Sequence, residues 1–537
     1  MTSDLIRSLI VVRASGHLAD GQRRYPRWEL TNAELQRLLE EGVGGVILLG
    51  GSATEVRERT AQLRRWAGKP LLLCADVEEG VGQRFEGATW LVPPLALGQL
   101  HRRDPGRATA LAERYGRCTG RDARALGLNW VLGPVCDVNN NPANPVINVR
   151  AWGEGPDAAA ELAAGFCRGV QAEGVLACAK HFPGHGDTAT DSHLELPLIA
   201  HSRDRLEAVE LPPFRSAIAA GVAAVMTAHL MLPALDAELP ATLSRAVLSG
   251  LLRQGLGFDG LIVTDALVME AIAGRYGVGE AAVLALAAGA DLVLMPGDAD
   301  LAMAAIATAL EEGRLDLRSL EASAARRQRA LASTEIATSP AGPPNLPPLE
   351  PDQALALELV QASLERQGPR WSRPRPGQAS VNLIRCDNAL SAPFLPLTAP
   401  ALNLPGAAGM QTCLLDRHSP SPWSGDPQAP LALERLPGVA QPDSPAVLLQ
   451  LFVRGNPFRG SAGAEEPWAE VVQQLQTRGQ LAGLVVYGSP YLWQGLRPLL
   501  ATQIPAAYSP GQMPLAQAEA LASLGVGDTE GQGGFTD

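Results

Sequence analysis

The sequence lacks long apolar stretches and any excess of basic residues. No window of about 18 consecutive residues is apolar throughout, so we expect no membrane span. The formal net charge of -12 argues against binding to nucleic acid or to an anionic membrane, since both need a basic face. The N-terminus has too short an apolar core, and no small-residue cleavage site, for a signal peptide.

Cysteine is also scarce. The seven cysteines are scattered and odd in number, and most lie in apolar surroundings, which does not fit a disulfide or zinc framework. We expect them to be reduced core residues of a cytoplasmic protein, and we expect no cofactor. The remaining composition, with 46% hydrophobic and 19% charged residues, is that of an ordinary globular protein long enough for two or three domains.

Short apolar runs alternate with helical patterns through residues 1–336. The runs are continuous in apolarity, as in parallel strands that are covered on both faces. They cover residues 9–12, 45–49, 70–75, 128–132, 175–179, 223–226, 261–263 and 291–295. About eight such repeats predict a (β/α)8 barrel, with an open doubly wound sheet as the alternative.

A second, smaller domain is expected after the barrel. Residues 337–368 read as a Pro-rich linker followed by a helix over 353–366. Residues 369–537 read as a flavodoxin-like α/β domain that is Pro-rich and irregular up to 445, and it shows no catalytic constellation. We expect the Gly-rich C-terminus to be disordered.

Polar residues follow several of the apolar runs. Asp76 follows the third, residues 134–137 the fourth, residues 180–181 the fifth, residues 227–229 the sixth and Asp265 the seventh. In a barrel the carboxyl ends of the strands meet at one mouth, which is where barrel active sites lie. This placement favours the barrel over the open sheet.

The loop over residues 180–193 is the richest of these segments. Lys180, His181, His185, Asp187, Asp191 and His193 are interrupted by Pro183 and two glycines, so they lie on a loop. Asp191 and His193 are two residues apart and share a side of an extended backbone. We hypothesise that His193 is a general acid/base oriented by Asp191. Local backbone bonding of a surface Asp remains the alternative.

Asp265 and Lys180 each have two interpretations. Asp265 is either a helix N-cap or the fixed carboxylate that a retaining glycosidase needs. Lys180 is either a Schiff-base nucleophile or a donor to a sugar hydroxyl. The four histidines 181, 185, 193 and 229 lack a helical ligand frame, which makes a metal site improbable.

The segment K-H-F-P-G-H-G-D-T-A-T-D-S-H resembles the signature of the β-N-acetylglucosaminidases of glycoside hydrolase family 3. V-T-D-A-L-V-M-E-A-I resembles the family's nucleophile segment. The resemblance is strong over about residues 40–330, and two segments near the C-terminus resemble the second domain of two-domain members.

The resemblance implies a role for each matching residue. Asp265 becomes the nucleophile, and His193 with Asp191 the acid/base dyad. Family β-glucosidases place the acid/base in the second domain, so a loop dyad favours the hexosaminidase branch. The implied substrate is a small carbohydrate, and the expected substrate-binding residues are Asp76, Arg84, Arg150, Lys180, His181, His229 and Met269.

Two positions depart from the family pattern: Glu79 replaces a Gly and Val81 replaces an Arg. Several alternatives stay open. The chain could be a phosphorylase that uses phosphate in place of water, a β-glucosidase-like hydrolase, a Schiff-base lyase using Lys180, or a sugar-binding barrel without activity. The natural glycoside is open as well, with peptidoglycan fragments and chitin fragments among the candidates. The sequence does not give the oligomeric state; a monomer fits it.

Overall fold

The computed structural model describes residues 2–188, 196–334, 346–372, 379–419, 445–456, 460–461 and 466–527. The chain divides into two compact units, Met1–Ala356 and Leu357–Asp537. Three expectations fall partly or wholly outside the described residues: the loop dyad of Asp191 and His193, the Pro-rich segment at 337–345, and the C-terminal tail from 528.

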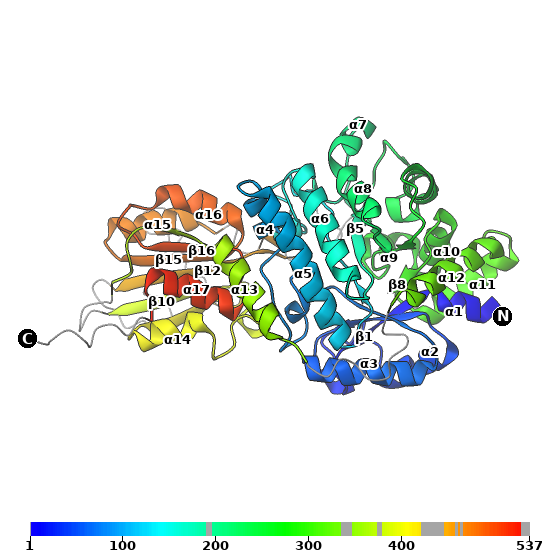
Figure 1. The fold of residues 1–537 in the computed structure, drawn as a ribbon, viewed down its shortest axis with the longest axis horizontal. Coiled ribbons are helices and arrows are strands. Elements are labelled where there is room, and N and C mark those ends of the chain that lie inside the picture. Colours follow the sequence, from blue (N-terminus) through cyan, green and yellow to red (C-terminus); the bar gives the residue numbers. More distant parts are fainter. Residues whose placement is uncertain are drawn as a thin grey trace, which may run out of the picture. The chain divides into compact units, whose positions relative to one another are not determined.

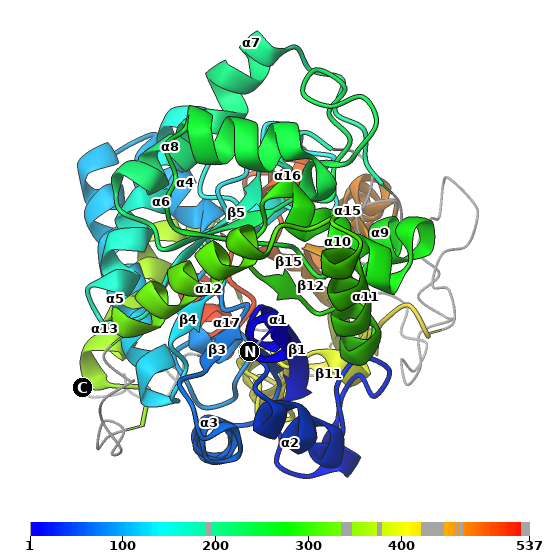
Figure 2. The same ribbon diagram turned by 90° about the vertical axis from the view of Figure 1, so that its right-hand side faces the viewer.

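The first unit is a closed barrel of parallel strands (Figures 1 and 2). A five-stranded sheet, in the order β4-β3-β2-β1-β8, and a three-stranded sheet, β5-β6-β7, meet along two edges. Parallel bridges join Trp130 to Leu176 at one edge and Val263 to Leu292 at the other. The strands are β1 (Ile10–Ser15), β2 (Gly45–Leu49), β3 (Leu72–Ala75), β4 (Trp130–Val131), β5 (Cys178–Phe182), β6 (Ala224–Thr227), β7 (Leu261–Val263) and β8 (Val293–Leu294). The predicted (β/α)8 barrel is confirmed.

Helices connect successive strands and cover the outside of the barrel (Figure 2). The main ones are α2 (Asn32–Glu41), α3 (Ala53–Ala67), α5 (Pro105–Ala125), α6 (Pro156–Gln171), α8 (Leu211–Ala219), the π-helical η6 (Ala246–Gly255), α10 (Val278–Ala288), α11 (Ala299–Glu311) and α12 (Leu317–Ala332). Shorter helices are α1 (Thr2–Ser8), α4 (Leu95–His101), α7 (Arg203–Arg205) and α9 (Glu270–Tyr276).

Helix α2 shows why these segments are helical. Thr31 caps it by accepting from the Glu34 N–H, while the Glu34 side chain accepts from the Thr31 N–H. Gly42 ends it in the left-handed conformation. Its buried residues Leu35, Leu38 and Leu39 recur at helical spacing and face the strands.

The second unit is a six-stranded sheet in the order β11-β10-β12-β15-β16-β9. Five of its strands are parallel: β10 (Ser380–Arg385), β11 (Gln411–Leu415), β12 (Ala446–Val453), β15 (Leu481–Gly488) and β16 (Ala506–Ser509). In chain order their arrangement is 2-1-3-4-5, the flavodoxin-like order that we expected. The antiparallel β9 (Glu365–Gln367) lies at the edge, next to β16. The helices are α14 (Pro400–Ala407), α15 (Trp468–Thr477), α16 (Pro490–Leu496) and α17 (Pro514–Leu524), and β13 (Gly455–Asn456) pairs with β14 (Gly460–Ser461).

One expectation about this part of the chain was wrong, and the predicted helix is present with shifted bounds. Residues 369–445 are not irregular throughout, because they contain β10, α14 and β11. The prolines that suggested a loop are compatible with this, since Pro400 occupies the first turn of α14, where no N–H is needed. The predicted helix over 353–366 is α13 (Glu350–Ser363), and the chain after it turns into β9 because backbone pairing with β16 takes over.

No single helix of the described residues is long and apolar enough to span a bilayer, and the bent pair α9 and α10 meets that requirement only when the two are joined.

Candidate active site

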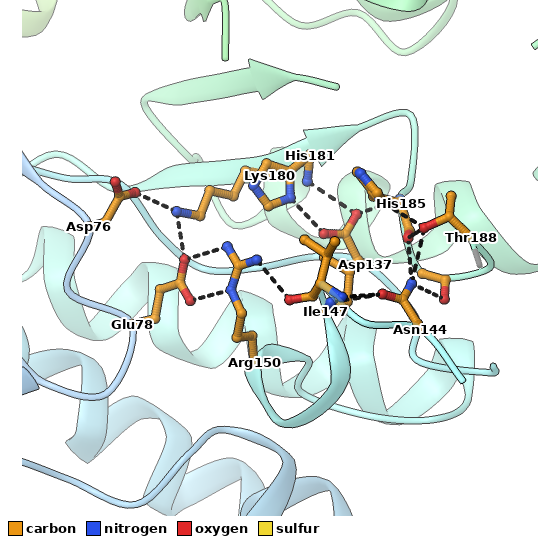
Figure 3. A network of polar contacts seen from close by, with 12 residues as sticks. Asp76, Glu78, Asp137, Asn144, Ile147, Arg150, Lys180, His181, His185 and Thr188 are labelled. Atoms are coloured by element: carbon orange, nitrogen blue, oxygen red, sulfur yellow. Dashed lines mark hydrogen bonds and ion pairs between the residues drawn. The ribbon is translucent and has the colours of Figure 1, made fainter. Parts of the chain in front are cut away.

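Charged side chains at the carboxyl ends of β3 and β5 form one hydrogen-bonded network (Figure 3). The Lys180 Nζ lies 2.7 Å from the Asp76 Oδ1 and 2.7 Å from the Glu78 Oε1. Arg150 donates to both oxygens of Glu78, over 2.7 Å from Nε and 2.8 Å from Nη2. Asp76, Lys180 and Arg150, predicted from the sequence as substrate ligands, are therefore brought together around Glu78.

Burial and pairing set the charges of this network. Burial alone would lower the pKa of Lys180, but Asp76 and Glu78 outweigh it and raise that pKa above its usual value. Burial would raise the pKa of Glu78, but Arg150 and Lys180 hold it well below its usual range. The same balance, with Glu78 as the main partner, raises the pKa of Arg150. Glu78, Arg150 and Lys180 thus stay ionised, with Lys180 as an ammonium donor.

A second cluster lies around Asp137, just after β4 (Figure 3). The Asp137 Oδ2 lies 2.7 Å from the His181 Nδ1, and its Oδ1 accepts from the backbone N–H groups of His181 (3.2 Å) and His185 (2.7 Å). Burial would raise the pKa of Asp137, but His181 and these contacts lower it. An ionised Asp137 fixes the His181 ring with its Nε2 turned away from the carboxylate.

The loop after β5 is held at its base by Asn144. Its Nδ2 donates to the carbonyls of His185 (2.9 Å) and Gly186 (2.8 Å), and its Oδ1 accepts from the N–H groups of Val146 and Ile147, both at 2.9 Å. Thr188 Oγ1 lies 2.9 Å from the His185 Nδ1. Burial lowers the pKa of His185 to about 4, so this ring is neutral at neutral pH.

Asp265 follows β7 on a turn that contacts the end of β6. Its N–H donates to the Thr227 Oγ1 (3.3 Å), and its Oδ1 accepts from the Ala266 N–H (2.7 Å). Its charge is among those that act on His185 and Cys178, which lie in or after β5. It does not cap α9, whose N-cap residue is Met269.

His229 and Met269 both contact the turn that carries Asp265. The His229 Nε2 donates to the Ala266 carbonyl (3.1 Å), and its Nδ1 lies 2.9 Å from the Thr242 Oγ1. The Met269 N–H donates to the same Ala266 carbonyl (3.1 Å). Both side chains are buried, and their backbone contacts set the conformation of the Asp265 turn.

The remaining positions of the Asp76 segment lie on different sides of it. Arg84 is exposed, and its Nε donates to the Asp76 carbonyl (2.9 Å). Glu79 is buried and accepts from the Trp90 Nε1 (3.2 Å), and Val81 is fully buried. Both departures from the family pattern are thus integrated into the packing.

Sequence reasoning missed Glu78, Asn144 and Thr188 as members of the site, and it noted Asp137 only as a residue at a strand end. The sequence signal that could have identified Glu78 is its position two residues after Asp76. Asn144 and Thr188 carry no motif of their own, since their importance comes from backbone contacts.

One group of side chains among the described residues has the spacing of metal ligands: Cys118, Asp122 and Asp352. It belongs to α5 and α13, not to the strand ends, and Asp352 is paired with Arg121. All seven cysteines are free and buried.

Two family models match the chain. The Glycosyl hydrolase family 3 N terminal domain matches residues 4–330, and the Bacterial Glycosyl hydrolase family 3 C-terminal domain matches residues 373–525.

Similar proteins point the same way. The beta-hexosaminidase A of Pseudoalteromonas piscicida is 35% identical over 363 residues, which is 60% of this chain and 60% of the relative's length. The beta-hexosaminidase of Neisseria meningitidis serogroup C (strain 053442) is 38% identical over 279 residues, 51% of this chain and 77% of the relative. Among solved structures, a family 3 beta-N-acetylglucosaminidase from Paenibacillus sp. str. FPU-7 is 28% identical with a TM-score of 0.78, covering 98% of this chain and 97% of that one. The beta-glucoside phosphorylase BglX has a TM-score of 0.75 at 20% identity, covering 99% of this chain and 92% of that one, and shares the fold.

Proposed function

The chain belongs to glycoside hydrolase family 3, and from that premise we propose that it is a retaining β-N-acetylglucosaminidase. The observation that carries the proposal is that β3, β5 and β7 each deliver a charged group, Asp76, Lys180 and Asp265, at the same end of one barrel. The similarity to beta-hexosaminidases supports the choice of sugar.

Asp265 is the nucleophile in this proposal. It attacks the anomeric carbon and forms a covalent glycosyl-enzyme, which water then hydrolyses. The Ala266 N–H, 2.7 Å from the Asp265 Oδ1, fixes the orientation of the carboxylate. The turn is supported in addition by His229 and Met269 through the Ala266 carbonyl.

His193, oriented by Asp191, is the proposed general acid and base. Both residues lie outside the described residues, so this assignment rests on the sequence motif. An imidazole has an ordinary pKa of about 6.5 and can both donate to the leaving oxygen and then accept from water near neutral pH.

The ion-pair network binds the sugar hydroxyls in this proposal. Lys180, Arg150 and His181 present fixed donors, and Asp76, which is 38% exposed, presents an acceptor to the mouth. Lys180 is ill suited to form a Schiff base, since its two carboxylate partners hold it protonated. Arg84 lies at the exposed rim.

The test is turnover of aryl β-N-acetylglucosaminide by wild type and by Asp265→Ala. We expect Asp265→Ala to lose activity by several orders of magnitude, while Asp259→Ala, which removes an 80% exposed carboxylate, retains it. A slowly hydrolysed fluorinated glycoside should add one sugar mass to wild type only. Normal turnover by Asp265→Ala, or an absent adduct on an active enzyme, would remove the nucleophile assignment.

Phosphate distinguishes the hydrolase from a phosphorylase. The hydrolase releases free N-acetylglucosamine at a rate that is independent of phosphate, whereas a phosphorylase needs phosphate and releases the sugar 1-phosphate. We further propose that the protein is a cytoplasmic monomer acting on peptidoglycan fragments. The seven free cysteines support a reducing compartment. Activity on purified muropeptides, cell fractionation and light scattering test these points.

A further inference from the structure

Three charged groups at the barrel mouth come from odd-numbered strands. Asp76 follows β3, Lys180 lies in β5, and Asp265 follows β7. In a barrel of this kind, alternate strands supply the inward side chains of one layer. The fourth odd strand, β1, carries one charged residue, Arg13, near its carboxyl end.

The strand register places Arg13 on the inner face. Arg13 is the partner of Ile47 in β2, and Ile47 is the partner of Cys74 in β3. Partners in neighbouring strands direct their side chains to the same face. Lys180 and Cys178 of β5 act electrostatically on the Cys74 thiol, so the face of the sheet that carries Cys74 is the interior face. Arg13 lies near the carboxyl end of β1, the end that faces the mouth, and Asp76 and Arg84 are among the charges that act on its guanidinium.

The loop after β1 is built around this guanidinium. The Arg13 Nη2 lies 3.7 Å from the Oε1 of the buried Glu29, and its Cζ lies 5.1 Å from the Tyr25 ring centroid and 6.0 Å from that of Trp28. Glu29 also accepts from the Tyr25 N–H (3.0 Å), and the Leu30 N–H donates to the Arg13 carbonyl (3.1 Å). These contacts hold a side chain that is only 16% exposed.

Arg13 retains hydrogen-bonding capacity toward the mouth. A guanidinium has five N–H donors. Within the part of the chain that the structure describes, its one charged contact at 4 Å or less is the 3.7 Å approach to Glu29. A largely buried guanidinium that is stacked on aromatic rings and has spare donors is suited to a planar oxygen acceptor.

The geometry points to Arg13 as a specificity-determining residue that binds the reacting sugar, donating to a carbonyl or carboxylate oxygen on the ring's flank. This inference rests on the proposed function, because that function sets how the sugar lies. With the anomeric carbon at Asp265 and a hydroxyl at Asp76, the ring spans from β7 to β3, which are opposite in the barrel. Lys180 from β5 then faces one flank, and Arg13 from β1 faces the other.

Two substituents could supply the oxygen on that flank: the acetamido carbonyl at C2, or a carboxylate at C6. Three aryl β-glycosides with one leaving group separate them, namely the N-acetylglucosaminide, the glucoside and the glucuronide. In Arg13→Met, which keeps the length but not the donors, we expect kcat/KM to fall about 10- to 100-fold for the substrate with the recognised oxygen, mainly through KM. The glucoside, which has neither oxygen, should change less than about threefold.

The pattern of losses decides the outcome. A selective loss on the N-acetylglucosaminide identifies the acyl oxygen, and a selective loss on the glucuronide identifies the carboxylate. An equal loss on all three glycosides, or no loss, overturns the inference. Arg13→Lys should recover part of the selectivity, and Arg329→Met, an exposed arginine on α12, should behave as wild type.

Two further measurements keep this test separate from the proposed function and from folding. If wild type hydrolyses none of the glycosides, the proposed function fails, and calorimetric binding of N-acetylglucosamine, glucose and glucuronate to wild type and Arg13→Met still tests Arg13. If Arg13→Met does not fold, Arg13→Lys tests the same selectivity, because it keeps a cation near β1 but removes the planar guanidinium. Selectivity equal to that of wild type in Arg13→Lys would count against the inference.

Discussion

Replacing Glu78 with Gln removes the only fully buried carboxylate that the ion-pair network holds between two cations. In the native protein its side chain is 4% exposed and accepts from Lys180 at 2.7 Å and from Arg150 at 2.7 and 2.8 Å. After the substitution Lys180 keeps Asp76, which is 38% exposed, and Arg150 keeps the Val146 carbonyl at 3.0 Å. Breaking one side of such a buried pair costs about 3–5 kcal/mol of unfolding free energy.

Urea unfolding of the barrel unit, followed by tryptophan fluorescence, measures this cost. The matched control is Glu79→Gln, the adjacent buried carboxylate, which accepts from the neutral Trp90 indole at 3.2 Å and should cost only about 1 kcal/mol. A Glu78→Gln variant no less stable than the Glu79→Gln variant would refute the reasoning. The double variant Glu78→Gln/Arg150→Met should lose less unfolding free energy than the sum of the two single losses, since no unpaired guanidinium remains.

The pH dependence of the same contribution has a defined sign. The pKa of Glu78 is held well below its unfolded value, so its stabilisation is complete above about pH 4.3 and is lost as the pH falls through the folded value. Glu78→Gln should therefore differ from wild type at pH 7 and converge with it in strong acid.

Three further predictions concern other buried groups. Burial lowers the pKa of His185 to about 4, so the unfolded state takes up the proton at a higher pH than the folded state does. The free energy of unfolding should therefore fall by about 3 kcal/mol between pH 6.5 and 4. His185→Gln should flatten that slope in urea titrations. Asp122 makes the opposite contribution to the pH dependence of stability, because burial raises its pKa to about 6. Asp122→Asn should be about 2–3 kcal/mol more stable than wild type at pH 8 and no more stable at pH 3. Asp137→Asn should lower kcat/KM about 10- to 100-fold, since an amide cannot accept from His181 Nδ1 and both backbone N–H groups at once; unchanged kinetics would contradict this.

The barrel could be predicted because its strands are buried on both faces and read as continuous apolar runs. The same rule found β12, β15 and β16 in the second unit. It missed β10 and β11, although Val381, Leu383 and Ile384 are buried, because the neighbouring prolines were taken as evidence of a loop. In the described residues between β10 and β11, Pro400 begins α14 and Pro405 lies inside it, and neither lies in a strand, so no ladder is disturbed. Proline density in this segment therefore does not exclude strands.

Site residues were predictable where a strand end delivers them, as with Asp76, Lys180 and Asp265. Glu78 was not, because its position depends on the turn after β3. Gly80 has a positive φ of 74°, and a Cβ there would meet the Thr89 carbonyl at 2.6 Å, so the turn packs closely against residues 89–91. That close return directs Glu78 to Arg150, which arrives from a loop 72 residues later. The spacing of residues in the sequence reveals neither this turn nor Arg150 as the partner of Glu78.

The difference between the predicted and the missed residues follows from how each acts. A group that acts on a substrate must point into the mouth, and the strand that precedes it sets this direction locally. A group that holds others in place, such as Asn144 or Asp137, can bond backbone atoms from any loop that comes near, so its partners are set by the tertiary structure. Arg13 belongs to the first kind: it lies near the end of a strand and points inward, but its long side chain and its carboxylate partner give it the appearance of a structural ion pair. Its selectivity among sugars, measured against its effect on stability, separates the two roles, because an arginine that only supports the loop would alter all substrates alike.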